Sequence, residues 1–392
     1  MGTSKTNAPL HTEWQGAPVR KFYSPDVWIE GKAEEQLHRV AQMSNVLQVA
    51  AFPDLHPGKY GPVGTAILSN LLHPQLVGND IGCGMSLFIL DLPARKIRAE
   101  KAANRLRSLE GIWEGDPFPL LEKWGLPLDA SPTSLGTIGG GNHFCELQIL
   151  DKVHNQELAE QSGLIRGASY LLIHSGSRSF GTAIFEEICS QGPADLYPDH
   201  PQAIDYLARH DQAVAWASLN RQIIAQRAAK ALRSEARLLS DSPHNLIEGM
   251  KGAFLHRKGA AKADIPFVPL AGSRDSLSYL LKPTNSNEES LFSISHGAGR
   301  KYDRSSMHGR LKNRKSDQLR LSRTSYGGHV VCEDKHLLIE EAPDAYKSPV
   351  QVLKELTEKQ LAITVAAFKP IVTFKKARPE KNKPTSRRNT HE

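Results

Sequence analysis

The chain has 392 residues, 40% of them hydrophobic, and carries a formal net charge of +7. This composition supports a large buried core, but no window approaches the roughly 18 apolar residues of a membrane span, and the first ten residues lack a signal peptide's apolar core. Four cysteines scattered over so long a chain exclude a disulfide framework, so we expect a soluble, globular, cytoplasmic protein.

Hydrophobic spacing predicts two long helices and several strands. Apolar residues recur at three- and four-residue intervals over 32–46 and 211–236, which lack interior Pro and Gly and so favour helices. Passage 115–132 is typical of a loop. Short apolar runs that end in Gly-rich turns predict strands, at 86–92, 168–178, 290–300 and 370–376. No internal repeat or linker divides the chain, so the fold class is α+β in one composite domain.

Positive charge is concentrated in two segments. Residues 300–323 hold nine Lys or Arg and two Asp, and residues 369–392 hold eight Lys or Arg and two Glu, so the rest of the chain is acidic. Phosphate binding requires local cation density, which makes both segments candidates for polyanion contact. For the end of the chain, a solvated and disordered tail is at least as well supported.

The densest chemical signal is GNDIGCGMS, residues 78–86. Asp80 and Cys83 lie three positions apart in a turn that glycines make tight. A carboxylate and a thiolate so close can hold one metal ion or bridge two. An Asp that caps a turn beside a buried Cys is an equally supported alternative.

The motif GGGNHFCE adds a histidine after three glycines. In a strand, Asn142, Phe144 and Glu146 share one face, whereas His143 and Cys145 share the other. One face of the strand could then contact a bound ligand while the opposite face contacts a metal ion. The glycines would leave backbone N–H groups available to donate hydrogen bonds to an anion. The alternative is a flexible loop with a structural histidine.

Further histidines follow the same logic. His174 and His296 come at the ends of predicted strands beside Gly-rich turns, and His244 stands beside an amide. One such histidine would more often be structural, but several together with an Asp and a Cys could hold two metal ions. Ligand softness alone favours zinc. The set comprises Asp80, Cys83, His143, His174 and His244.

His296 is then the imidazole left over. An uncommitted imidazole near metal ions, in a turn followed by arginine, is placed to act as a nucleophile or a general acid or base. The chain lacks a GxxxxGK[ST] loop, so nucleotide chemistry here is not of the P-loop type.

In this order, the motifs resemble those of the RtcB family of RNA-splicing ligases, which join RNA ends using GTP. The resemblance extends over about residues 30–376 and is specific in combination. The motifs are FPDLHPGKYGPVG, DIGCGM, GGGNHFCE, HSGSR, HN with a later RKGA, AGSRDSLSY, SHGAGR, EAPDAYK and a terminal apolar strand that ends in lysine.

The resemblance implies a single large ligase domain with mixed sheets around a central metal and nucleotide cleft. Two Mn²⁺ ions, rather than zinc, would be held by the five residues named above, with Cys83 as the bridge. His296 would attack the α-phosphate of GTP and carry GMP, with Gly297 and Gly299 letting backbone approach a phosphate. The implied GTP pocket comprises Asn142, His143, Phe144, Cys145, Glu146, His244, Asn245, Ala271, Gly272, Ser273, Arg274, Ser278, His296, Gly297, Ala298, Gly299, Tyr346 and Lys375.

It also implies that RNA 3′-phosphate or 2′,3′-cyclic phosphate ends are joined to 5′-hydroxyl ends through an RNA(3′)pp(5′)G end, in RNA repair or tRNA splicing. The implied partners are broken RNA, with tRNA and rRNA as candidates, and an archease or a release-factor-like operon protein. No membrane partner is expected. We predict an N-terminal extension over 1–29, a ligase domain over 30–376 and a basic, disordered tail over 377–392.

Some features depart from the family pattern. Arg274 and Asp275 stand where the family commonly has Met and Gly, the 302–328 stretch is unusually basic, and Lys376 replaces a usual Gly. These departures predict a divergent bacterial RNA-repair paralogue. Two alternatives are a dinuclear-metal phosphoesterase without nucleotide transfer and a non-catalytic RNA-binding module. The retained reactive residues argue against the latter.

Overall fold

The structure is a computed structural model that describes residues 16–190, 195–284, 288–311 and 315–378. Most of the predicted N-terminal extension and nearly all of the predicted basic tail lie outside the described residues. Among the described residues, no helix has both the length and the hydrophobicity to cross a bilayer.

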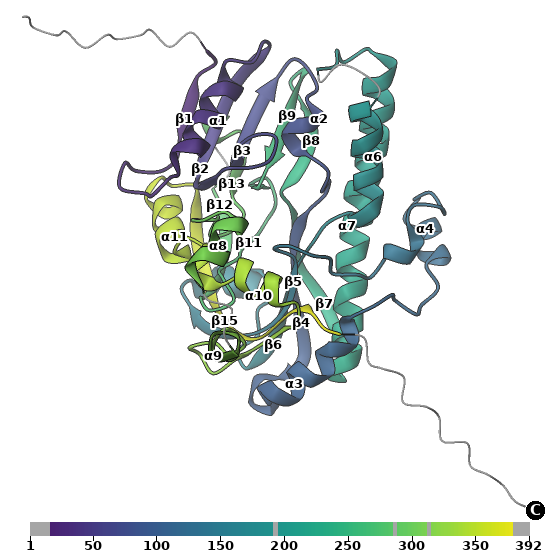
Figure 1. Cartoon of the computed structure of the whole chain (residues 1–392), viewed down its shortest axis with the longest axis vertical. Coiled ribbons are helices and arrows are strands. Elements are labelled where there is room, and N and C mark those ends of the chain that lie inside the picture. The colour runs from purple at the N-terminus through teal and green to yellow at the C-terminus, as the bar shows by residue number, and fades with distance from the viewer. Residues whose placement is uncertain (1–15, 191–194, 285–287, 312–314, 379–392) are drawn as a thin grey trace, which may run out of the picture.

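Two sheets form the body of the molecule (Figure 1). The larger sheet runs in the order β11 (Val268–Leu270), β12 (Ser278–Pro283), β15 (Ala362–Lys376), β5 (Phe144–Val153), β6 (Ala168–Ser175), β4 (Gly84–Pro93) and β7 (Ala236–Pro243), with β14 (His329–Cys332) paired to β15. The smaller sheet runs in the order β1 (Val19–Lys21), β2 (Val46–His56), β3 (Val63–Ser69), β9 (Ala253–Lys258) and β8 (Asn245–Met250). A two-stranded ribbon joins β10 (Ala260–Lys262) to β13 (Ser293–Ser295).

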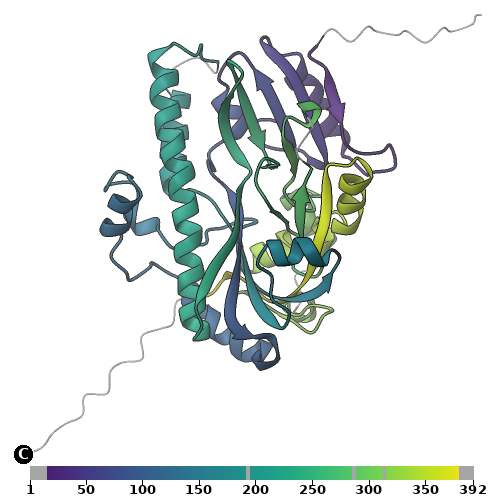
Figure 2. The same ribbon diagram turned by 180° about the vertical axis from the view of Figure 1, so that it is seen from behind.

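Helices cover the outside of these sheets. The longest, α7 (Pro201–Leu232), runs along one side of the molecule and contacts β4, β6, β7 and β8, so it spans both sheets (Figure 1), and Figure 2 shows the same helix from behind. Its buried positions include many alanines, whose small side chains let the sheets approach the helix axis. The other helices are α1 (Gly31–Ala41), α2 (Pro74–Val77), α3 (Ala99–Leu106), α4 (Phe118–Lys123), α5 (Gln156–Gln161), α6 (Arg178–Ser190), α8 (Arg304–Arg310), α9 (Lys315–Leu321), α10 (Lys335–Glu340) and α11 (Pro349–Glu358).

The predicted α+β class and the single large domain are confirmed, with corrections to the elements. The helix predicted over 211–236 begins ten residues earlier and ends at Leu232, because Arg233 adopts a left-handed conformation that stops it. Passage 115–132 contains α4 and is not entirely loop. The strand predicted over 290–300 is reduced to three residues, since Leu291 and Phe292 also have positive φ angles.

Strand register explains how the predicted site residues meet. Within the larger sheet, Gly84 at the start of β4 pairs with Ser175 on β6 and with Pro243 on β7. Phe144 at the start of β5 pairs with His174. In antiparallel pairs the start of one strand lies beside the end of the next, so the turns that carry the site residues gather at one edge of the sheet.

Candidate metal and nucleotide site

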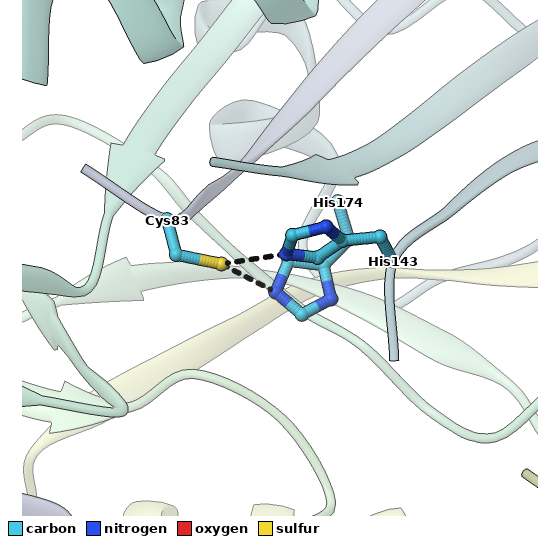
Figure 3. A group of neighbouring side chains, drawn as sticks. All are labelled: Cys83, His143 and His174. Carbon is cyan, nitrogen blue, oxygen red and sulfur yellow. Dashed lines mark hydrogen bonds between the residues drawn. The ribbon is translucent and has the colours of Figure 1, made fainter. Parts of the chain in front are cut away.

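Three of the predicted ligands form a compact group at this edge. The Cys83 Sγ lies 3.3 Å from His143 Nε2 and 3.2 Å from His174 Nε2. Figure 3 shows the thiol pointing at both imidazoles, which come from separate segments of the chain. All three side chains are buried, and their ligand atoms lie within 4.8 Å of one another, which is close enough for one metal ion.

The other two predicted ligands flank this group on different sides. Asp80 Oδ2 lies 2.9 Å from His143 Nε2, and His244 Nε2 lies 3.3 Å from His174 Nε2. The His244 Nδ1 atom is buried and has no hydrogen-bond partner among the described residues. A carboxylate, a thiol and three imidazoles therefore converge, with donors on either side of Cys83, and this donor set fits one or two divalent cations.

Burial controls the protonation of these groups. Burial lowers the pKa values of His174 and His244 well below the ordinary value, so both imidazoles are neutral and have lone pairs for a metal ion. Burial and the nearby Asp80 raise the pKa of the Cys83 thiol, so a cation that binds the thiolate must displace its proton. Metal affinity at this site should therefore rise with pH.

Arg221 of α7 fixes the two turns that carry Asp80, Cys83 and His174. Its buried guanidinium donates from Nη1 to Gly82 O at 2.8 Å and to Ser175 O at 2.9 Å. Gly82 has a φ of +70°, and a Cβ there would lie 2.8 Å from the Val214 backbone of α7. Only glycine lets this turn pack so closely on the helix.

His296, the predicted nucleophile, is held from behind by Asp54. The His296 Nδ1 atom lies 2.7 Å from Asp54 Oδ2 and 2.7 Å from Gly259 O. A carbonyl oxygen can only accept, so Nδ1 carries the proton and Nε2 keeps its lone pair. The His296 ring lies against the His244 ring, with centroids 4.5 Å apart, so the lone pair lies beside the candidate metal ligands.

Asp54 is ionised although it is completely buried. Burial would raise the pKa of its carboxyl, but the hydrogen bonds that it accepts from His296 and Ser295 hold that pKa below the ordinary value. Lys347 donates to Pro53 O and Leu55 O, on either side of Asp54, at 3.0 and 2.6 Å. These contacts anchor the segment that orients His296.

Gly299 is required by contact with the same segment. It has a φ of +70°, and a Cβ would lie 2.3 Å from Asp54 O. Gly299 was expected to let backbone approach a phosphate. The structure adds a second reason for glycine at this position, because Gly299 lets the turn that follows His296 pack directly against Asp54.

A cavity of about 370 Å³ adjoins the metal ligands and contains most of the predicted nucleotide residues. The predicted residues among its lining are Asp80, Cys83, Asn142, Phe144, Glu146, His174, His244, Asn245, Ala271, Gly272, Ser273, Arg274, His296, Gly297, Ala298, Gly299, Tyr346 and Lys375.

Three predicted pocket residues are not among the residues that line this cavity: His143, Cys145 and Ser278. Cys145 is fully buried in the apolar cluster beneath the sheet, because it projects from β5 on the side opposite Phe144 and Glu146. Ser278 accepts a hydrogen bond from Gly272 N at 3.1 Å and so supports the cavity wall from outside. The predicted shared face of His143 and Cys145 is also wrong: β5 begins at Phe144, so His143 belongs to the preceding turn and reaches Cys83.

The cavity is rich in positive charge. Its lining includes three carboxylates, Asp80, Glu146 and Glu341, against six cationic side chains, which are Lys59, Lys258, Arg274, Arg300, Arg304 and Lys375. Such a surplus favours a polyanionic ligand. Arg300 and Arg304 belong to the predicted basic segment, so part of that segment lines the cavity; its residues 312–314 lie outside the described part.

Glu341 and Glu146 are buried in different charge environments. Burial would raise the pKa of Glu341, but Lys375, Arg300 and Arg304 hold it at about 2. Burial raises the pKa of Glu146 to about 7, although Thr373 and Gln148 donate hydrogen bonds to its carboxylate. Glu341 is therefore a fixed anion, whereas Glu146 can exchange a proton near neutral pH.

Comparison with known proteins now identifies the family. The model of the family described as tRNA-splicing ligase RtcB matches residues 36–112 and 128–376. The chain belongs to the RtcB family. The predicted resemblance is thereby confirmed.

Individual RtcB proteins match over nearly their full lengths. RNA-splicing ligase RtcB2 of Escherichia coli strain ATCC 25922 is 42% identical over 365 residues, which cover 90% of this chain and 94% of that protein. RtcB1 of the same strain is 28% identical, with 85% of this chain and 91% of that protein covered. The tRNA-splicing ligase RtcB of Thermococcus kodakarensis is 26% identical, with coverages of 90% and 93%.

Sequence reasoning missed several residues of this RtcB-family site. Asp54 lies in the quoted motif FPDLHPGKYGPVG, but nothing local linked it to His296. Arg221 and Lys347 donate to backbone carbonyls of distant segments, and Glu341 forms ion pairs with three cations from two other segments of the chain. For Arg221 the signal available in the sequence was its position in the helical pattern, on the same face as the apolar residues Ala217 and Ile224.

Proposed function

We propose that this chain is a GTP- and Mn²⁺-dependent RNA ligase. It joins RNA 3′-phosphate or 2′,3′-cyclic phosphate ends to 5′-hydroxyl ends through a covalent His296–GMP intermediate. The observation that carries the proposal is the position of His296, whose Nδ1 is committed to Asp54 and Gly259 while its ring lies against the candidate metal ligand His244. Membership of the RtcB family supports the same reaction class.

The residues present fit the implied metal ions. Asp80, Cys83, His143, His174 and His244 would hold Mn²⁺, with Cys83 between donors on both sides. The Cys83 thiolate and the imidazoles are soft ligands that would suit zinc equally. The choice of manganese therefore depends on the family resemblance. When bound, the ions would supply positive charge that offsets the charge of the reacting phosphates.

In the first step, the Nε2 lone pair of His296 attacks the α-phosphorus of GTP. A phosphorus–nitrogen bond forms, the bond to the β-phosphate oxygen breaks, and pyrophosphate leaves in line. Asp54 balances the positive charge that the imidazole gains, and the proton stays on Nδ1. Lysines and arginines around the cavity offset the charge of the triphosphate.

In the second step, an oxygen of the RNA 3′-phosphate attacks the same phosphorus and breaks its bond to Nε2. A cyclic phosphate must first be hydrolysed to a 3′-phosphate.

In the last step, the 5′-hydroxyl oxygen attacks the RNA 3′-phosphorus and loses its proton, and GMP leaves. The product is a 3′,5′ phosphodiester. The basic segment that begins at Arg300 is a candidate for contact with the RNA backbone.

The proposal is tested by a ligation assay with two RNA oligonucleotides, one ending in a 3′-phosphate or cyclic phosphate and one beginning with a 5′-hydroxyl. We expect joined product that depends on both GTP and Mn²⁺, with ATP a poor substitute. A phosphoesterase would instead trim the phosphate without consuming GTP. That outcome would replace the ligase proposal with the alternative of a dinuclear-metal phosphoesterase.

Asp54→Asn should slow formation of the His296–GMP adduct by about 10- to 100-fold, because a neutral amide cannot balance the charge on the imidazole. It should also destabilise the protein at neutral pH. The lowered pKa of Asp54 means that its stabilising contribution is present above the ordinary Asp pKa and is lost as pH falls through the lowered value. The rate comes from single-turnover labelling and the stability from thermal unfolding at several pH values.

The matched control is Asp151→Asn, which changes an exposed carboxylate on β5. This variant should keep both the labelling rate and the stability of the wild type. Wild-type labelling by Asp54→Asn would show that His296 needs no anionic partner.

A further inference from the structure

Trp28 differs from the other tryptophans that the structure describes, because much of its ring is exposed. Three of them pack in one apolar cluster: Trp113, Trp124 and Trp216. Trp28 is instead 41% exposed, and its ring meets the Tyr302 ring edge-on, with centroids 6.1 Å apart. A single exposed ring is common on protein surfaces, so the groups around Trp28 decide whether it binds a ligand.

Unpaired cations surround these two rings. The guanidinium carbon of Arg310 lies 3.6 Å from the centroid of the Tyr302 ring, and Lys301 Nζ lies 5.3 Å from the same centroid. Neither cation forms an ion pair within the described part of the chain. Asp303, the acidic residue of this turn, is already engaged, since its carboxylate accepts from Ser306 N at 2.9 Å. The positive charge beside the rings is therefore available to a phosphate.

Tyr302 connects this surface with the cavity. It lies midway in the sequence between Arg300 and Arg304, which both line the cavity. Arg300 donates from Nε to Tyr302 O at 3.0 Å, and its guanidinium carbon lies 5.3 Å from the centroid of the Tyr346 ring, another part of the lining. Aromatic and cationic side chains therefore alternate from the cavity wall outward to Trp28. An RNA strand whose end lies in the cavity can pass over them.

We propose that Trp28, Tyr302, Lys301 and Arg310 form a subsite for one unpaired nucleotide of the RNA substrate. The inference rests on the proposed function, because it gives the course of the substrate strand outside the cavity. The base stacks on the exposed ring of Trp28, and the two cations contact the adjoining phosphates. Aromatic rings with neighbouring cations bind single strands of any sequence, because every base has a π-face. A base inside a duplex is already stacked, so this subsite favours unpaired ends.

The first test replaces Trp28 with Ala and, separately, with Phe in the full-length chain. Binding is measured by fluorescence anisotropy with a labelled single-stranded RNA that ends in a 3′-phosphate, without GTP so that no ligation occurs. Trp28→Ala should weaken binding by about 5- to 100-fold, and Trp28→Phe, which keeps a ring, should recover much of that loss. The matched control is Tyr197→Ala, which removes an exposed ring outside the cavity lining and should bind RNA as the wild type does.

Abasic RNAs distinguish stacking from a structural role of the ring. Removing the base at one position of the RNA should weaken binding to the wild type. With that abasic RNA, Trp28→Ala should cause no further loss, because the base and the ring act as a pair. Fully paired RNA should bind both proteins equally. Equal weakening by Trp28→Ala for paired RNA and for every abasic RNA would show that the ring only supports the structure, and would overturn the inference.

Salt dependence tests the two cations separately from the ring. The logarithm of affinity for a single strand falls with the logarithm of salt concentration, with a slope of about 0.7 per phosphate contact. Replacing both Lys301 and Arg310 with Gln should therefore reduce the slope by about 1.4, whereas Trp28→Ala should leave the slope unchanged. A wild-type slope in the double variant would overturn the assignment of these phosphate contacts.

Failure of this inference and failure of the proposed function give different results. If the wild type joins RNA with GTP and Trp28→Ala binds single-stranded RNA as tightly as the wild type, the subsite is refuted while the ligase proposal stands. The exposed ring would then be a candidate contact for a protein partner. If the wild type binds single-stranded RNA through Trp28 but forms no GMP adduct and joins no RNA, the proposed function fails while the subsite stands.

Discussion

Replacing His296 with asparagine is expected to abolish covalent labelling by α-³²P GTP, with a loss of at least about 1,000-fold relative to the wild type. Asparagine retains a donor for Asp54 and Gly259 but has no basic ring nitrogen, so the buried carboxylate keeps a partner while the nucleophile is lost. The wild-type adduct should be labile in acid and stable in base, as a phosphorus–nitrogen bond is. Peptide mapping of the labelled protein should locate it at His296.

The choice of asparagine matters because His296→Ala would leave Asp54 buried without its main partner and could unfold the protein. Thermal unfolding and Mn²⁺ binding of His296→Asn should resemble the wild type. His154→Ala, at an exposed histidine after β5, is the matched control and should be labelled normally. An adduct of wild-type yield in His296→Asn would transfer the nucleophile to another residue and refute the assignment.

Replacing Cys83 with alanine should remove metal binding and ligase activity together. Cys83 contacts two imidazoles at 3.3 and 3.2 Å and lies between donors on both sides, so no neighbouring group can take its place. Loss of an outer-shell partner alone typically costs 10- to 100-fold in metal affinity, and a direct ligand should cost at least about 100-fold. Bound Mn²⁺ is measured by elemental analysis after equilibrium dialysis, and activity by the ligation assay.

The pH dependence gives a second readout of the same contact. Because burial and Asp80 raise the pKa of the Cys83 thiol, Mn²⁺ must displace its proton, and wild-type affinity should increase with pH. That increase should be smaller for any metal that still binds Cys83→Ala. Cys189→Ala changes an exposed cysteine and should behave as the wild type in both assays. Full activity in Cys83→Ala would remove Cys83 from the metal site.

Much of the candidate site could be predicted because its reactive side chains stand beside Gly-rich turns in the sequence. Asp80, Cys83 and the histidines each follow or precede a Gly-rich turn at a strand end, and such turns carry polar side chains to the edge of a sheet. The structure brings all five predicted ligands together and places most of the predicted nucleotide residues around one cavity. Local sequence patterns predicted these residues because each motif contains both the turn and the reactive side chain that the turn positions.

Other features could not be inferred from local sequence. Asp54 and His296 are 242 residues apart, and only the pairing of distant segments makes one orient the other. Cys145 stands between two pocket residues in the sequence, yet strand alternation sends it into the apolar core. The helix starting at Arg178 was hidden because a Gly-rich turn precedes it.

The sequence by itself determined the fold class, the family resemblance and the chemical types of the candidate ligands, since these depend on residue identity and short-range spacing. Tertiary structure alone decided which atoms face one another. Antiparallel register gathered four strand ends at one edge of the sheet, and Asp54 and Gly259 determined which nitrogen of His296 is free. Distances between buried donors and acceptors arise only when remote segments pack, so one segment's sequence cannot predict them.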